Sequence, residues 1–304
     1  MKHISSVSFM LLLFAVAAVF TSCDGCSRQP AAVAEADCHL LFDTVCGERY
    51  QMLAHDADTN ILRSDYTVCW PRAGQLPDSL EQQLLDFLFG VQYRGEGRVR
   101  SLSDGCEAFL SDISLMLMDD DDFSSAVPSP TPVVIDSLHP DSYDNSNTLN
   151  LEIIDLGNLV TFVRYSEFYV RNSPHGLYGV TYLTLDRTNH RFMQLSDLMD
   201  TTTLGSVLLQ AVSQFPDNWE TVRNCLFEPD QPLPVPHSFF IDSTRANFVF
   251  TYQLYEITPY ACGIPSVVVP VQWLATQLPL TPYATQLLRP DADTLATTQD
   301  AEEK

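Results

Sequence analysis

The sequence predicts an α+β fold in which antiparallel sheets pack with a few helices and the chain forms two halves. Segments rich in aromatic and β-branched residues are joined by turn sequences, as in β-hairpins. A smaller number of segments carry an apolar stripe at helical spacing. Hairpins beside isolated helices are typical of an antiparallel sheet covered by helices. Hydrophobic residues make up 45% of the 304 positions, which is enough apolar material for a sizeable core.

Residues 1–22 have the features of an export signal. The apolar run Phe9–Phe20 is shorter than the roughly 20 residues that a bilayer-spanning helix needs, so it fits a signal peptide. Small residues stand directly before Cys23, which resembles the lipobox of bacterial lipoproteins. The resemblance implies that the chain is cut before Cys23 and anchored by lipid on its thiol, with residues 23–37 as a tether. The alternative is an ordinary secretory signal.

The net charge of the chain argues against two classes of binding partner, nucleic acids and anionic lipid surfaces. With 39 acidic and 16 basic residues, the formal charge is −23. Such a surface repels phosphate, so we expect no nucleic-acid binding and no electrostatic attraction to anionic lipids. The expected membrane contact is therefore the lipid alone. The expected location is the cell envelope, at the periplasmic face or the outer membrane.

The first half, residues 38–118, is expected to hold a strand and a helix. Asp65–Pro71 is rich in β-forming residues. A helix is predicted after Pro77, with Asp78 as its cap and Glu81 three residues later. Apolar side chains follow at helical spacing, and we interpret them as core packing rather than as a partner-binding groove.

Residues 119–148 are predicted to be an acidic, proline-rich linker or loop. Four aspartates at 119–122 offer oxygen ligands for a cation such as Ca²⁺. The run lacks the spaced ligands and the turning glycine of a calcium loop, so a solvated linker is the better interpretation.

The second half, residues 149–289, carries most of the predicted strands, and residues 290–304 are predicted to be a disordered tail. A helix is predicted from the apolar spacing between Leu204 and Phe215. The predicted strands are Leu149–Ile154, Leu159–Arg171, Val180–Leu185, Ser238–Asp242, Asn247–Tyr252 and Ser266–Val271.

The cysteines do not define a metal or redox site. No pair has zinc-ligand spacing, and Cys23 with Cys26 is not read as a redox pair because acylation would consume one thiol. In an oxidising compartment, disulfides are expected. The proposed pairs are Cys69 with Cys106 and Cys225 with Cys262, because each pair lies within one half.

Several stretches of the second half together resemble a known family. Ser173–Gly176, Thr181–Asp186 and Phe192–Leu198 are similar to its His-Gly loop, strand and helix start. Phe248–Gly263, with the run YEITPYACG, resembles its tyrosine-rich signature, and Val267–Leu274 resembles its closing strand. These residues identify a resemblance to the RsiV-like domain of unknown function, over about residues 150–275.

That family occurs in the extracellular part of an anti-sigma factor, beside a peptidoglycan deacetylase domain, and in bacterial lipoproteins. The resemblance therefore implies a cell-envelope protein. We do not expect the anti-sigma role, because the sequence shows no transmembrane helix before the domain. Ser173-Pro174 and Cys262 depart from the family pattern.

The sequence contains no recognisable motif of catalytic residues, so we expect that the protein is not an enzyme and binds no cofactor or metal. There is no GxSxG turn, no HExxH spacing and no glycine-rich phosphate loop. His175 and Glu256 are the titratable residues that stand out, and a structural role is the simpler interpretation of each. The alternative is a cell-wall-directed hydrolase that uses His175 and Glu256 as general acid and base.

Tyr252, Tyr255 and Tyr260 are the remaining candidates. Tyrosine offers a flat apolar face with a polar tip, which suits a glycan or a protein partner. Alternatively, alternate residues of this stretch pack in the core. We predict a non-catalytic envelope domain that binds a cell-wall glycan or an envelope protein through His175, Glu256 and these tyrosines. A structural component of a lipoprotein complex is a further possibility.

Overall fold

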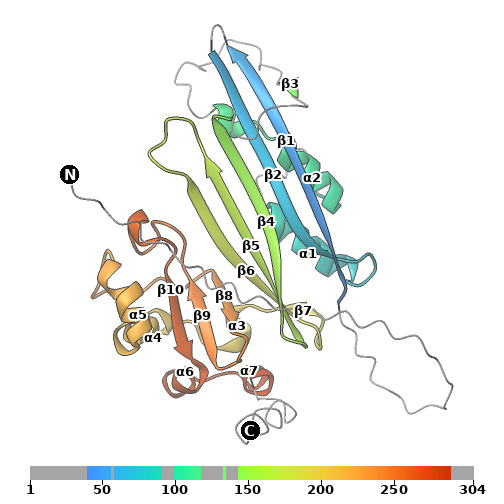
Figure 1. Cartoon of the computed structure of the whole chain (residues 1–304). Helices are drawn as coiled ribbons and strands as arrows, with labels where there is room; N and C mark the ends of the chain where they lie inside the picture. Colours follow the sequence, from blue (N-terminus) through green and yellow to red (C-terminus); the bar gives the residue numbers. More distant parts are fainter. Residues whose placement is uncertain (1–39, 56–57, 91–98, 118–132, 135–142, 289–304) are drawn as a thin grey trace, which may run out of the picture. The chain divides into compact units, whose positions relative to one another are not determined.

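In the computed structural model, the chain divides after Cys38 into two units, and all described residues belong to the second, His39–Lys304. All that follows concerns the second unit. The described residues are 40–55, 58–90, 99–117, 133–134 and 143–288 (Figure 1). The expected signal peptide, the lipidation residue Cys23, the tether, the aspartate run and the C-terminal tail lie outside them. In this described part, no helix is long and apolar enough to cross a bilayer.

A seven-stranded sheet forms the larger part of the unit, in the order β3-β1-β2-β4-β5-β6-β7 (Figure 1). The strands are β1 (Phe42–His55), β2 (Asp58–Pro71), β3 (Val133–Val134), β4 (Asn145–Asp155), β5 (Leu159–Tyr169), β6 (Leu177–Asp186) and β7 (Arg191–Phe192). Neighbouring strands are antiparallel except β2 and β4, which are parallel. The two predicted halves therefore share one sheet. Strand β4 begins at Asn145, inside the stretch that was expected to be a linker.

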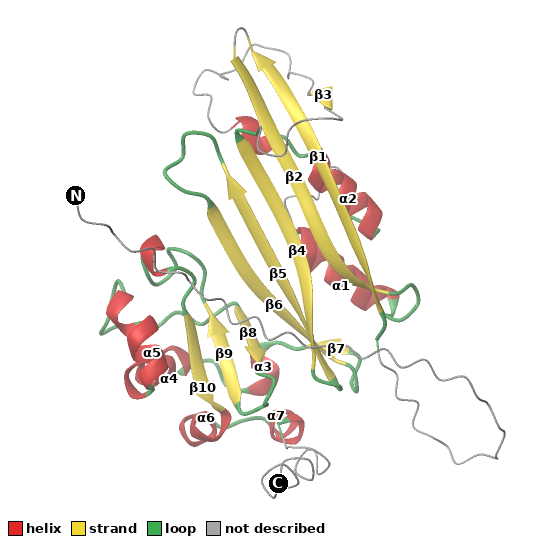
Figure 2. Ribbon diagram, viewed as in Figure 1, coloured by secondary structure: helices red, strands yellow, loops and turns green. Residues whose placement is uncertain are grey.

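Helices α1 (Asp78–Phe89) and α2 (Leu102–Ser111) cover one face of this sheet (Figure 2). Side chains alternate along a strand, so Tyr66, Val68 and Trp70 of β2 all point to the helices. The predicted helix after Pro77 is confirmed, but Pro77 is its N-cap and Asp78 is its first residue, without a capping hydrogen bond. Helix α2 was not predicted from the sequence. A 3₁₀ turn, η1 (Ser114–Leu117), follows it.

The described residues after β7 pack a second core around a three-stranded antiparallel sheet in the order β10-β9-β8 (Figure 2). Its strands are β8 (Ser238–Ile241), β9 (Asn247–Thr251) and β10 (Ser266–Pro270). Its helical segments are α3 (Leu195–Leu198), α4 (Leu204–Gln214), α5 (Pro216–Thr221), η2 (Arg223–Cys225), η3 (Tyr260–Cys262), α6 (Val271–Gln277) and α7 (Pro282–Leu287). The predicted α+β class and the six strands predicted for the second half are confirmed, with shifts of a few residues at their ends.

One predicted disulfide is present and the other is wrong. Cys225 and Cys262 are bonded, with a Cα–Cα distance of 6.3 Å. Cys69 and Cys106 are free. Cys106 is buried with Val68 and Trp70 on the helix-covered face. Because Cys69 lies between those two residues on β2, its side chain points to the opposite face of the sheet.

A buried carboxylate closes the hairpin between β6 and β7. Asp186 is fully buried and accepts hydrogen bonds from Asn189 Nδ2 at 2.7 Å and from the Tyr283 hydroxyl at 2.6 Å. Burial alone would raise the pKa of Asp186, but these hydrogen bonds outweigh it, so the pKa lies below its usual value. Arg191 lies 4.3 Å above the Tyr283 ring. The network therefore ties the hairpin to α7.

Candidate functional site

The structure brings three of the predicted residues together with Tyr178. His175 lies in the connection between β5 and β6, and Tyr178 follows it near the start of β6. Tyr255 and Tyr260 lie in the segment between β9 and β10. We call His175, Tyr178, Tyr255 and Tyr260 the His175 cluster.

His175 is held on both ring nitrogens and on one face. Its Nδ1 lies 3.0 Å from the carbonyl oxygen of Gly176, and its Nε2 lies 3.1 Å from the Tyr255 hydroxyl. A carbonyl oxygen only accepts, so in the neutral ring Nδ1 carries the proton and Nε2 accepts from Tyr255. The Tyr260 ring stacks on the imidazole, with centroids 3.6 Å apart and planes inclined by 17°. The imidazole therefore has a fixed orientation toward Tyr255.

The segment that carries the tyrosines is fastened to β6 by Gln253. The Gln253 side chain donates to the carbonyl of Val180 at 2.7 Å and accepts from the Val180 N–H at 3.2 Å. Gly179 allows this approach, because a Cβ there would lie 3.0 Å from Gln253 Oε1. The pair of bonds replaces a neighbouring strand at this edge of the sheet. The disulfide of Cys262 with Cys225 fastens the same segment at its other end.

Tyr255 occupies a strained backbone position. Its φ is +64°, in the left-handed region that bulky residues rarely adopt. The turn is stabilised by Glu256, whose Oε2 accepts from the backbone N–H of Gln253 at 2.8 Å. The turn leaves the Tyr255 side chain 51% exposed, beside His175 instead of in the core.

Tyr252 and Glu256, which the sequence also offered as ligand-binding candidates, lie outside the His175 cluster and have the alternative roles of core packing and a structural contact. Tyr252 is fully buried and donates its hydroxyl to the carbonyl of Pro234 at 2.9 Å. Burial raises its pKa above the usual value. Glu256 is exposed, and its carboxylate stabilises the turn in which it lies by accepting from the Gln253 N–H. Within the described residues, its carboxylate makes no hydrogen bond to His175.

Tyr165 and Glu167 border the cluster and were missed in the sequence. They stand on the face of the sheet opposite α1 and α2, where Glu167 pairs with Tyr178 across β5 and β6. The Tyr165 hydroxyl donates to Glu167, and burial together with this bond raises the Tyr165 pKa. Burial and the neighbouring Tyr178, Tyr255 and Glu167 likewise raise the Tyr260 pKa. Arg164, Tyr165, Ser166 and Glu167 are consecutive polar residues, so no alternation along β5 marked these two in the sequence.

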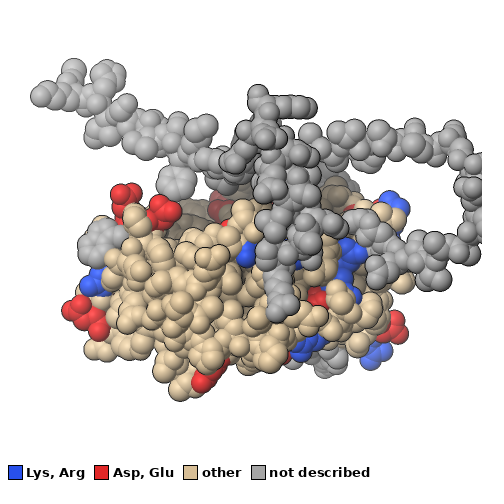
Figure 3. All heavy atoms as spheres, turned by 90° about the horizontal axis from the view of Figure 1, so that it is seen from below, with Lys and Arg blue, Asp and Glu red and all other residues tan. Residues whose placement is uncertain are grey.

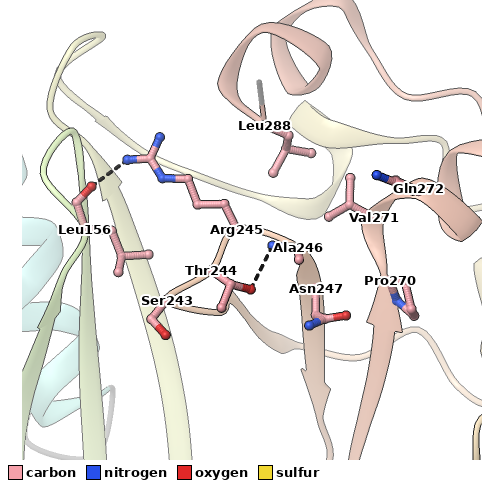
Figure 4. A pocket seen from close by; sticks show the side chains of 10 residues that line it. All are labelled: Leu156, Ser243, Thr244, Arg245, Ala246, Asn247, Pro270, Val271, Gln272 and Leu288. Carbon is pink, nitrogen blue, oxygen red and sulfur yellow. Dashed lines mark hydrogen bonds between the residues drawn. The ribbon is translucent and has the colours of Figure 1, made fainter. Parts of the chain in front are cut away.

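A separate pocket of about 660 Å³ lies between the β4–β5 turn, the β8–β9 turn and the start of α6 (Figure 4). Arg245 reaches across it and donates to the carbonyl of Leu156 at 2.5 Å and to the side chain of Asn158. Like Tyr255, Arg245 has a positive φ, of +55°. No predicted site residue lines this pocket.

One face of the molecule shows no single region of concentrated charge (Figure 3). On the face drawn in Figure 3, acidic and basic side chains are scattered between larger uncharged areas. Among the described residues, no group of three or more His, Cys, Asp or Glu side chains is arranged to hold a metal ion. The His175 cluster thus offers aromatic faces, hydroxyl groups and an imidazole.

Part of this chain is similar to a domain of unknown function. A family model described as "Protein of unknown function (DUF3298)" matches residues 209–272, inside the stretch of the RsiV-like resemblance. No curated protein matches the chain.

Two solved structures are similar. One is a DUF3298 family member from Bacteroides fragilis NCTC 9343, with 18% identity, a TM-score of 0.55, and coverage of 82% of this chain and 97% of that chain. The other is a DUF3298 family protein from Pseudomonas aeruginosa PAO1, with 16% identity, a TM-score of 0.48, and coverage of 81% and 96%. The first likeness shows that the two chains share a fold.

Proposed function

We propose that this protein is a lipid-anchored cell-envelope domain that binds a ligand or partner without catalysis, and that the His175 cluster is its contact surface. The observation that carries the proposal is the presentation of Tyr255. Tyr255 is 51% exposed, yet its hydroxyl is held by a hydrogen bond with His175, a residue 80 positions away in the chain. A rigid aromatic side chain with a polar tip loses little conformational entropy on binding, which favours recognition of a glycan or a protein.

The rival hydrolase, which uses His175 and Glu256, has less support. General acid and base must both reach the reacting atoms, whereas the Glu256 carboxylate is engaged with its own turn and His175 with Tyr255. A Glu256→Gln variant separates the two ideas. The binding proposal expects unchanged turnover of peptidoglycan fragments, at background level. Turnover in the parent chain that this variant abolishes would establish the hydrolase.

The binding proposal is tested with the full-length chain in detergent and two probes, insoluble peptidoglycan sacculi and solubilised envelope proteins. We expect one probe to retain the chain, and Tyr255→Ala to reduce retention at least about tenfold, as for a contact residue worth 1.4 kcal/mol or more. Tyr143→Ala is the matched control, because Tyr143 is 38% exposed and lies over Arg63, outside the cluster. Absence of retention by both probes, or equal losses in the two variants, would refute the proposal.

Anchoring is a separate part of the proposal and rests on the sequence before Cys23. Acylation of one cysteine supplies membrane affinity in proportion to the buried methylene groups. Membrane fractionation of cells that express the Cys23→Ser variant tests it. We expect release into the soluble fraction, and retention in the membrane would contradict the anchor.

A further inference from the structure

Tyr255 and His175 have the geometry of an activated nucleophile. The hydroxyl of Tyr255 donates to Nε2 of His175 at 3.1 Å, and Nδ1 of His175 donates to the carbonyl of Gly176 at 3.0 Å. Proteins activate a hydroxyl in this way, with a base in hydrogen-bond reach and a third group that orients the base. Here a backbone carbonyl is the orienting group.

The imidazole is prevented from turning away. Tyr260 stacks on it at 3.6 Å between centroids, and the Tyr260 ring itself makes an edge contact with Tyr178 at 6.1 Å. The disulfide at Cys262 follows Tyr260 by two residues, so the backbone beside the stacking ring is fastened covalently. Nε2 therefore stays directed at the Tyr255 hydroxyl.

The backbone at Tyr255 is an independent sign. A positive φ at a bulky residue costs free energy and persists only where its surroundings fix it, which happens often at functional sites. Here the fixing contacts are those of Glu256 with Gln253 and of Gln253 with Val180. Their result is an exposed phenolic side chain beside a base.

We propose that Tyr255 is a covalent modification site that accepts an acyl group from an activated ester, with His175 as the general base. The Tyr255 oxygen attacks the carbonyl carbon, and an O–C bond forms. The ester C–O bond breaks, and its electron pair leaves with the alcohol or phenol oxygen. The hydroxyl proton passes to Nε2 of His175 and then to water. The reaction needs no oxidant, metal or cofactor.

Other tyrosines of the described chain lack this arrangement. Tyr252 is buried and bonded to a backbone carbonyl, and Tyr165 donates to Glu167, a carboxylate. Tyr143 is 38% exposed and lies over Arg63, without an imidazole. Tyr143 is thus the internal reference for the reactivity of an exposed tyrosine.

The test is acylation of the full-length protein by p-nitrophenyl acetate, followed by peptide mass mapping of the acetyl group over time. We expect Tyr255 to react at least about tenfold faster than Tyr143. General-base catalysis usually raises a rate by roughly 10²–10⁴-fold, and we expect a gain near or below that range because the pair is open to water. In His175→Gln, Tyr255 should slow to the rate of Tyr143. In His175→Ala, added imidazole should restore the rate.

Circular dichroism and thermal unfolding establish that the variants are folded, and Tyr255→Phe locates the label. Equal rates at Tyr255 and Tyr143 in the parent protein would overturn the proposal. A folded His175→Gln variant that keeps the fast rate at Tyr255 would overturn it as well. Either result is independent of what the His175 cluster binds.

Discussion

Loss of the disulfide between Cys225 and Cys262 should cost the protein a large part of its stability. The bond joins residues separated by 37 positions. In the chain-entropy model, opening a loop of this length stabilises the unfolded state by about 4 kcal/mol at 25 °C. The same two segments are also joined by the hydrogen bond from Phe227 N–H to the Ile257 carbonyl. The effect is therefore expected mainly in the unfolded state.

The assay is urea unfolding of the full-length chain, with and without dithiothreitol, beside a Cys225→Ala/Cys262→Ala variant. We expect the free energy of unfolding to fall by about 2–4 kcal/mol in the variant, and by the same amount when the parent chain is reduced. A Cys46→Ser/Cys69→Ser variant is the control, because both thiols are free in the structure. A change below about 0.5 kcal/mol on reduction would refute the reasoning. So would a reductant effect of equal size in the alanine variant.

Three further predictions concern other parts of the chain. Gly205→Ala should destabilise the fold by about 1–3 kcal/mol in urea unfolding despite the helix preference of alanine, because the new Cβ would lie 2.0 Å from the backbone oxygen of Leu233. The pKa of Asp186 is lower in the folded state than in the unfolded state. The ionised carboxylate therefore contributes to the free energy of unfolding above the unfolded pKa of about 3.9, and this contribution is lost as the pH falls through the folded-state pKa. Tyr283→Phe should therefore lower the free energy of unfolding at pH 7 by about 1.5–3 kcal/mol. In urea unfolding at a series of pH values, the stability of this variant should fall less steeply toward acid pH than that of the parent chain. Sucrose-gradient flotation should place the parent chain with lipid vesicles and the Cys23→Ser variant at the bottom.

The sequence predicted elements whose signals are local. Hairpin turns, strand composition and the apolar stripe after Pro77 gave β4, β5, β6, α1 and α4 in nearly their observed places. Helix α2 was missed although Ser101 caps it, accepting from the Asp104 N–H at 3.1 Å. Gly105 weakens the helical pattern there. It is present because a Cβ would lie 2.2 Å from the Phe89 ring.

The candidate site was predicted in part. The tyrosine-rich stretch and the His-Gly loop pointed to residues that do meet, but no periodicity told which tyrosine would face His175. The alternation of side chains along β9 assigns Tyr252 to the core, because Phe248, Phe250 and Tyr252 share one face and are buried together. The turn after Tyr252 breaks that alternation, so Tyr255 leaves the core. Alternation along β2 turns Cys69 away from Val68 and Trp70, but the place of Cys106 beside those two depends on α2, which the sequence did not predict.

The parallel pairing of β2 with β4 affects how the chain must acquire its structure. Seven residue pairs join these strands, from Leu62 with Asn145 to Val68 with Leu151. During synthesis, the edge of β2 that faces β4 therefore stays unpaired until residues about 80 positions downstream have emerged. Free strand edges are templates for aggregation. A chain that ends before Asn145 is thus expected to be insoluble on its own, and expression of such a fragment should require the remainder in trans.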